Sequence, residues 1–228
     1  MVPWHLLRKK LRVAFVVIFS LASILILWQT SLVLASTNSD RLMGNDRYLT
    51  AIAISQKSYP NGTDTAIITT GENFPDALSA APLAQKYNAP ILLTEFNNLN
   101  SDTSTELKRL KVKKVYIIGG TGVISEDIDK QLYLMGISVL RLAGQDRYET
   151  ALMVANEVGI KKGIFVVSGL DFPDALSAAP IAAAKGMPII LVPSDDLTPL
   201  QKIFLSKNTI PNTYILNDNS EISDKIIK

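Results

Sequence analysis

An arginine followed directly by a tyrosine occurs twice in this chain, as Arg47-Tyr48 and again as Arg147-Tyr148. A guanidinium fork beside an aromatic ring suits the capture of a phosphate or carboxylate while a sugar stacks on the ring. The competing interpretation is an internal ion pair between the arginine and a neighbouring aspartate, with the tyrosine packed beneath a helix. The sequence leaves both interpretations open.

A second repeated element, Phe-Pro-Asp-Ala-Leu-Ser-Ala-Ala-Pro, spans residues 74–82 and returns unchanged at residues 172–180. It stands where an expected strand gives way to a helix, and ligands of open α/β sheets bind at the carboxyl ends of strands. Asp76 and Asp174 are therefore candidate ligand-binding residues. We favour the structural interpretation, in which Pro and Asp suit the first helical turn and Pro82 causes a kink or early break.

A glycine-rich run begins with Gly119 and Gly120, after an expected strand and before an expected helix. This is the geometry of an anion-binding loop. The run is not a dinucleotide fingerprint, because Ser125 stands in place of its last glycine and Arg141 in place of the ribose-binding acid. The sequence predicts a tight turn or a phosphate cradle here, and no dinucleotide site.

The composition excludes several classes of function. Cysteine is absent and the one histidine is His5, so the rest of the chain cannot form a Ser-His-Asp triad, a cysteine nucleophile or a His/Cys zinc site. We expect no cofactor and no metal. Four of the 23 basic side chains lie in residues 1–35, which leaves 19 against 21 acidic ones, a net charge of −2. Such a body has no basic surface for nucleic acid.

The N-terminus has the composition of a signal peptide. Residues 1–12 are basic, an apolar stretch follows from Val13 to Trp28, and Val33 and Ala35 fit cleavage before Ser36. An uncleaved membrane anchor is the alternative, since the apolar stretch approaches the roughly 17–20 residues that span a bilayer. Either way, we expect the rest of the chain to be exported.

These motifs lie in two copies of one unit, repeat 1 (residues 41–140) and repeat 2 (residues 141–228). Each copy alternates short apolar strand patterns with helical ones. In repeat 1 the strands are expected at 65–70, 91–94, 115–118 and 138–142, and the helices around 48–59, 76–86, 101–110 and after Ser125. Such alternation predicts an α/β fold of three layers, with a parallel sheet covered on both faces.

Several motifs in order carry a resemblance to a known family. Arg-Leu-x-Gly-x-Asp-Arg-Tyr-x-Thr-Ala, Phe-Pro-Asp-Ala-Leu-Ser, Pro-Ile-Leu-Leu and Ile-Ile-Gly-Gly resemble the cell wall binding repeat type 2 family over residues 41–228. The resemblance implies tandem toprim-like or Rossmann-like units that anchor secreted proteins to anionic secondary polymers of Gram-positive walls. By position it implies these polymer-binding residues: Arg47, Tyr48, Asp76, Ile91, Leu92 and Leu93 in repeat 1, and Arg147, Tyr148, Asp174, Ile189, Ile190 and Leu191 in repeat 2.

Members of the family usually carry three repeats and an effector domain, whereas we expect two repeats and no effector here. Two repeats would form one junction and leave apolar faces bare, which favours self-association or binding to other repeat proteins. We therefore expect a non-enzymatic anchor at the cell surface. The alternatives are a truncated or partner-completing chain, and a wall-polymer hydrolase that pairs Asp76 or Asp174 with Asp46 or Asp146.

Overall fold

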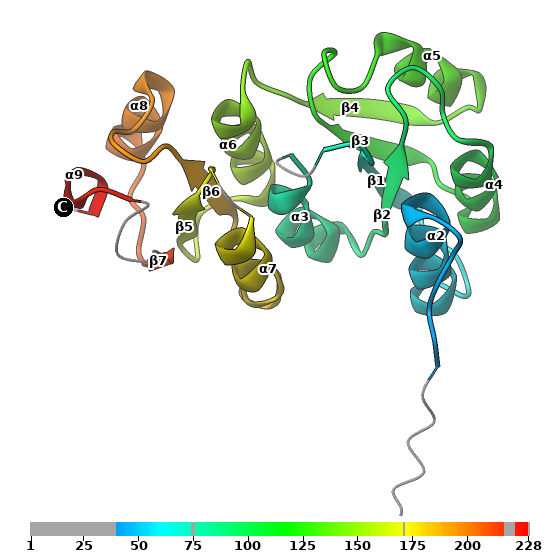
Figure 1. The fold of residues 1–228 in the computed structure, drawn as a ribbon, viewed down its shortest axis with the longest axis horizontal. Coiled ribbons are helices and arrows are strands. Elements are labelled where there is room, and N and C mark those ends of the chain that lie inside the picture. The colour runs from blue at the N-terminus through cyan, green and yellow to red at the C-terminus, as the bar shows by residue number, and fades with distance from the viewer. Residues whose placement is uncertain (1–39, 74–75, 171, 217–221, 228) are drawn as a thin grey trace, which may run out of the picture. The chain divides into compact units, whose positions relative to one another are not determined.

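The computed structural model describes residues 40–73, 76–170, 172–216 and 222–227 (Figure 1). The expected signal segment lies outside these ranges, as do Phe74, Pro75 and residues 217–220. Contacts divide the chain into Met1–Arg41 and a compact unit, Leu42–Lys228, which contains both repeats except Arg41. Among the helices of the described ranges, none has the length and hydropathy that a membrane crossing requires.

Four parallel strands form the first sheet: β1 (Thr65–Thr70), β2 (Ile91–Thr94), β3 (Lys114–Ile118) and β4 (Ser138–Leu142). Their order is β2-β1-β3-β4, so the chain leaves β1 for one neighbour and then crosses back to the other. A reversal of this kind leaves a crevice at the carboxyl ends of the two strands beside it, here β1 and β3.

Helices cover both faces of this sheet, as the near-continuous apolar strands predict. Ile68 and Ile117 share a core cluster with the helices of one face, whereas Ile67 and Tyr116 share a second cluster with those of the other. The helices of the first face are α2 (Arg47–Ser58), α4 (Ser101–Leu110) and α5 (Glu126–Leu134). The helices of the second face are α3 (Ala80–Tyr87) and α6 (Arg147–Val158). The predicted three-layer α/β architecture is confirmed.

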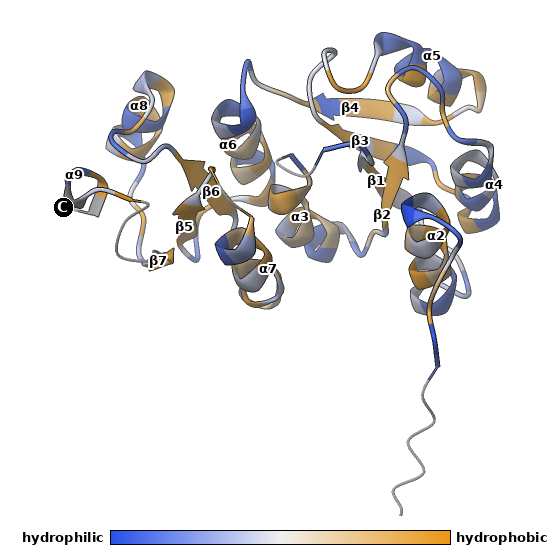
Figure 2. Cartoon of the chain, viewed as in Figure 1, coloured by the Kyte–Doolittle hydropathy of each residue, from blue (hydrophilic) through white to orange (hydrophobic). Residues whose placement is uncertain are grey.

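The second sheet has the strand order β6-β5-β7, again with parallel neighbours. Its strands are β5 (Ile164–Ser168), β6 (Ile189–Val192) and β7 (Thr213–Leu216). The helices that follow α6 are α7 (Pro173–Lys185), α8 (Pro199–Lys207) and α9 (Asp224–Ile227). Figure 2 shows β5 and β6 as hydrophobic ribbons between helices of mixed character, the pattern expected of a sheet buried on both faces.

Helix α6 joins the two sheets. Its Val154 packs in the second cluster of the first sheet, while Leu152 and Ala155 pack against β5 and β6 of the second sheet. Although α6 begins repeat 2 in the sequence, it therefore also completes the covering of repeat 1. This shared helix brings the loop before it, residues 143–146, next to the strand ends of repeat 1.

The prolines of the repeated element behave differently in the two repeats. In repeat 1 a 3-10 turn, η1 (Asp76–Ser79), precedes α3, so the break expected near Pro82 is present. In repeat 2 the same element forms a longer helix, because α7 continues through Pro180. Because proline has no N–H, the carbonyl of Leu176, four residues earlier, lacks its helical hydrogen-bond partner. Both Pro180 and Leu176 are exposed, so solvent can hydrogen-bond this carbonyl and the helix survives.

Candidate functional site

The aspartate of each Asp-Arg-Tyr motif caps a helix. Asp46 Oδ1 accepts a hydrogen bond of 2.7 Å from the backbone N–H of Leu49 at the start of α2. Asp146 Oδ1 accepts one of 2.9 Å from that of Glu149 at the start of α6. These bonds satisfy N–H groups that lack a partner within the helix. The ion pair weighed for this motif is replaced by a capping role of the aspartate.

The arginine and tyrosine of each motif hold the end of a strand. Arg47 Nη1 donates to the carbonyl of Gly71, and Arg147 Nη1 donates to that of Gly169 at 2.7 Å. The tyrosine rings pack on the same glycines, because a Cβ atom at Gly71 would lie 2.7 Å from Tyr48 Cε1. A side chain larger than hydrogen would therefore displace the ring. The same contact recurs between Gly169 and Tyr148.

A pocket of about 370 Å³ lies at the carboxyl ends of β1 and β3, the crevice expected from the strand order. Both repeats contribute to it. Repeat 1 supplies Thr70, Asn73, Asp76, Gly120, Thr121, Gly122 and Val123, and repeat 2 supplies Gly144, Gln145, Asp146, Arg147 and Thr150. We call this the junction pocket. Its lining is rich in hydroxyl, amide and carboxylate groups, which recognise ligands that carry hydroxyls.

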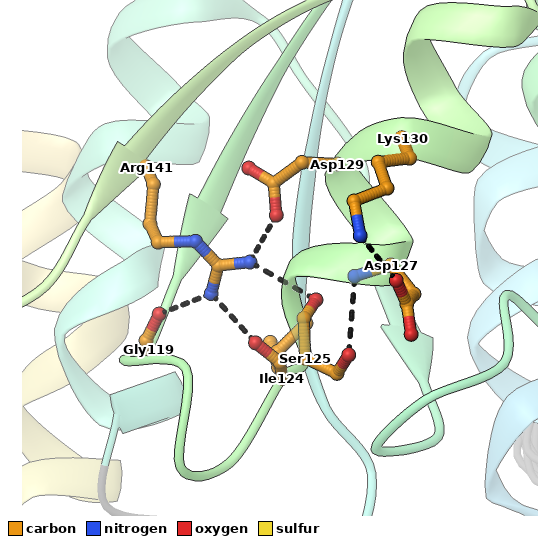
Figure 3. A network of polar contacts seen from close by, with 7 residues as sticks. All are labelled: Gly119, Ile124, Ser125, Asp127, Asp129, Lys130 and Arg141. Atoms are coloured by element: carbon orange, nitrogen blue, oxygen red, sulfur yellow. Dashed lines mark hydrogen bonds and ion pairs between the residues drawn. The ribbon is translucent and has the colours of Figure 1, made fainter.

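Arg141 of β4 fixes the glycine-rich loop on one side of the junction pocket (Figure 3). Its Nη1 donates to the carbonyls of Gly119 at 2.8 Å and Ile124 at 2.9 Å, and its Nη2 bonds Ser125 O and the Asp129 carboxylate. Within the loop, the N–H of Ile124 donates to Gly120 O at 3.0 Å. The tight turn expected here is present. Its arginine stands where a dinucleotide site would need an acid.

Asp76 is the half-buried carboxyl group of the junction pocket. Its Oδ2 lies 3.1 Å from the position that a Cβ atom at Gly119 would occupy, so a larger residue there would crowd the carboxylate. Burial raises the pKa of Asp76, the positive charge of Arg147 lowers it, and the negative charge of Asp146 raises it, with a net increase. A carboxyl group of repeat 1 is thus influenced by both charged groups of the repeat 2 motif.

The structure brings together some of the predicted residues and separates others. Asp76, Gly120 and Arg147 line the junction pocket, with Gly119 directly beneath Asp76. Residues that the sequence reasoning did not select, among them Asn73 and Gln145, complete it. In the sequence, these residues are marked only by their proximity to a repeated motif. The other selected residues of these motifs lie outside this lining: Arg47, Tyr48, Tyr148 and Asp174.

The apolar run of each repeat lies away from the candidate site. Leu92 in β2 is fully buried, as are Ile189, Ile190 and Leu191 in β6, while Ile91 and Leu93 are half-buried strand residues. The carbonyl of Leu191 is also occupied, because it accepts a hydrogen bond from the Gln201 side chain. These residues form the core and present little or no surface to a polymer. Within the described ranges, no cluster of three acidic, histidine or cysteine residues could hold a metal ion.

Comparison with known proteins gives a consistent result. A model of the family "Cell wall binding domain 2" matches residues 41–129 and again residues 141–227. The N-acetylmuramoyl-L-alanine amidase LytC of Bacillus subtilis (strain 168) is 35% identical over 193 residues, which cover 85% of this chain and 39% of that protein. The amidase enhancer of the same organism is 38% identical over 159 residues, 70% of this chain and 22% of that protein.

Two solved structures from Clostridium difficile share the fold. Cwp6 superposes with a TM-score of 0.76 at 32% identity, over 82% of this chain and 30% of that one. Cwp8 superposes with a TM-score of 0.74 at 33% identity, over 82% of this chain and 32% of that one. The chain thus spans well under half the length of each of these four relatives.

Proposed function

Because the chain belongs to the cell wall binding domain 2 family, we propose that it anchors non-covalently to the bacterial cell wall by binding an anionic wall polymer. The observation that carries the proposal is the junction pocket, a polar site of about 370 Å³ to which both tandem copies contribute. On this proposal residues 41–140 and 141–228 are the two binding repeats, and residues 1–35 direct their export to the cell surface.

The lining of the junction pocket suits one segment of a substituted glycan. Asp76 accepts hydrogen bonds from sugar hydroxyls, and the guanidinium of Arg147 pairs with an anionic group of the polymer. Of its five N–H donors, the bond to Gly169 uses one. Since the pocket holds two acids and one base, hydroxyl contacts carry most of the recognition and each site is weak. A polymer that engages many anchored chains compensates through multivalency.

We propose that the pocket binds its ligand without hydrolysing it. The two carboxyl groups that a glycoside hydrolase would need, Asp76 and Asp146, both line the junction pocket. Asp146 is committed to capping α6, however, because its Oδ1 accepts a hydrogen bond from the N–H of Glu149. The amidase named among the relatives is more than twice as long as the matched region, so its activity is not transferred to this chain.

Sedimentation with purified Gram-positive cell walls tests the anchor. Residues 36–228 are mixed with walls before and after acid removal of the anionic polymers, and bound protein is measured in the pellet. We expect binding to intact walls, loss of binding to stripped walls, and no release of reducing sugar. Failure to bind either preparation would refute autonomous anchoring, and sugar release would establish hydrolysis instead.

The internal duplication supplies a matched pair of variants for the same assay. Arg147→Ala and Arg47→Ala each remove a hydrogen bond to a strand-end glycine, so they are matched in the loss of that bond. Only Arg147 lines the junction pocket. We expect Arg147→Ala to weaken wall binding about tenfold or more, the value of one charge-assisted hydrogen bond, and Arg47→Ala to leave it unchanged. Equal losses in the two variants would contradict the placement of the site.

A further inference from the structure

Equivalent residues of the two repeats differ sharply in exposure on the side of repeat 1 that packs against repeat 2. Three residues of repeat 1 are buried there, Leu78 at 9% exposed, Leu83 at 0% and Tyr116 at 1%. Their counterparts 98 positions later are open, Leu176 at 60% exposed, Ile181 at 51% and Tyr214 at 42%. We call the latter three the acceptor face. It lies on α7 and β7, as its counterpart lies on η1, α3 and β3.

The opposite side of the contact shows the same difference. In repeat 2, Leu142 is 8% exposed and Val154 is 0% exposed, because both pack in the second cluster of repeat 1. Their counterparts 100 positions earlier, Leu42 and Ile54, are 42% and 48% exposed. We call Leu42 and Ile54 the donor face. Ile54 also lines a largely apolar groove of about 300 Å³ between α2 and the end of α3.

The described residues therefore contain one assembled copy of this contact and both halves of a second copy, each half exposed. We propose that the donor face of one chain docks on the acceptor face of a second chain, as repeat 2 docks on repeat 1 within the chain. The packing of α3 against α6 and α7 is the template (Figure 1). Because the two faces differ, the contact is head-to-tail and propagates into a ring or filament.

The acceptor side also has an open strand edge. Within the chain, β3 pairs on one edge with β4 of the same sheet, for example at Ile118 and Leu142. The counterpart of β3 in repeat 2 is β7, which pairs with β5 and, among the described strands, has no partner on its other edge. A second chain docked on the acceptor face would cover this edge, which otherwise remains open to pairing.

A pair of like charges weakens the contact between chains relative to the contact within the chain. Glu157 of α6 accepts hydrogen bonds from Tyr87 and from Tyr116, the latter at 2.9 Å. The counterparts of Glu157 and Tyr87 are Lys57 and Lys185, so two cations would meet where a carboxylate now meets a hydroxyl. Lys57→Glu restores the favourable pairing. It should strengthen the association severalfold.

The experiment measures the mass of residues 36–228 by sedimentation velocity, at concentrations up to about 1 mM, where weak association is detectable. We expect a mass that rises with concentration and rises further in Lys57→Glu. Ile54→Asp disables the donor face and Ile181→Asp the acceptor face, so each variant alone is a monomer. Their equimolar mixture forms a dimer and stops there, since one intact donor meets one intact acceptor. Leu134→Asp, at a residue of α5 that is 88% exposed and outside both faces, behaves as the unaltered chain.

The mixture distinguishes this contact from any symmetric one. A self-complementary interface that contains Ile54 or Ile181 would not be rescued by mixing the two variants. The proposal is overturned if both the unaltered chain and Lys57→Glu remain monomeric, or if association persists in either aspartate variant. Wall binding is measured at about 1 μM protein, far below the concentrations at which this association forms, so it reports the junction pocket inside one chain and is independent of this outcome.

Discussion

Replacement of Arg141 by methionine should destabilise the fold and disorganise the junction pocket together. The change keeps the apolar stem but removes the donors to Gly119, Ile124, Ser125 and Asp129. Loss of one partner of a buried ion pair costs about 3–5 kcal/mol. Because the side chains of Arg141 and Asp129 remain 16% and 21% exposed, water replaces part of the loss. We therefore expect a cost near the lower limit, about 3 kcal/mol.

Urea unfolding measures this cost, and the wall sedimentation assay measures its effect on binding. With a slope of about 2 kcal/mol per molar urea, the unfolding midpoint should fall by about 1.5 M. Lys130→Met is the control in the same region, since it removes an ion pair to Asp127 whose two side chains are 69% and 59% exposed. We expect no measurable change from that variant. A loss below about 1 kcal/mol for Arg141→Met would refute the clamp inferred for the loop.

Two further predictions concern carboxyl groups that are buried or half-buried. Glu106 accepts hydrogen bonds from Ser55 at 2.6 Å and from Arg109 at 2.8 Å. Burial raises the pKa of Glu106, but these partners together lower it by more, so the net effect is a decrease. Its charge thus stabilises the fold above the unfolded pKa, and Glu106→Gln should cost about 2 kcal/mol at pH 7, a difference that shrinks on acidification. Asp76 has a raised pKa, so its charge destabilises the fold at neutral pH. Asp76→Asn should raise the melting temperature at pH 7, less so below the unfolded pKa, and weaken wall binding, whereas Asp174→Asn leaves binding intact.

Most of the architecture could be predicted from local sequence. Residues 65–70 and 91–94 form strands as expected, because uninterrupted apolar runs between helices occur where a parallel sheet is buried on both faces. Ser125 caps α5 as expected, with its hydroxyl 3.1 Å from the N–H of Asp127. The position of α6 could not be predicted. Its apolar periodicity indicates a buried helix, but not that Val154 would cover the sheet of the preceding repeat.

The candidate site was predictable only in part, because it is formed where two repeats meet. Arg47 and Arg147 have the same neighbours in the sequence and make the same bond to a strand-end glycine. Nothing in the motif shows that only Arg147 adjoins the strand ends of another repeat. The apolar runs were selected as candidates for a related reason. A sequence match identifies what two copies share, and Ile189 in β6 is shared because it fills the core.

Positions at which the two repeats carry different residues show which contacts the fold requires. Ser55 and Glu106 form a buried polar contact between α2 and α4, yet their counterparts in repeat 2 are Ala155 and Phe204, an apolar pair in the core between α6 and α8. The fold therefore accepts either chemistry at that position, provided that buried polar groups are paired. The Asp-Arg-Tyr motif is kept in both repeats because the helix cap and the strand-end bond are needed wherever this unit folds. On the proposed function, ligand binding is then a property of the junction: identical residues bind or do not bind according to whether another repeat lies beside them.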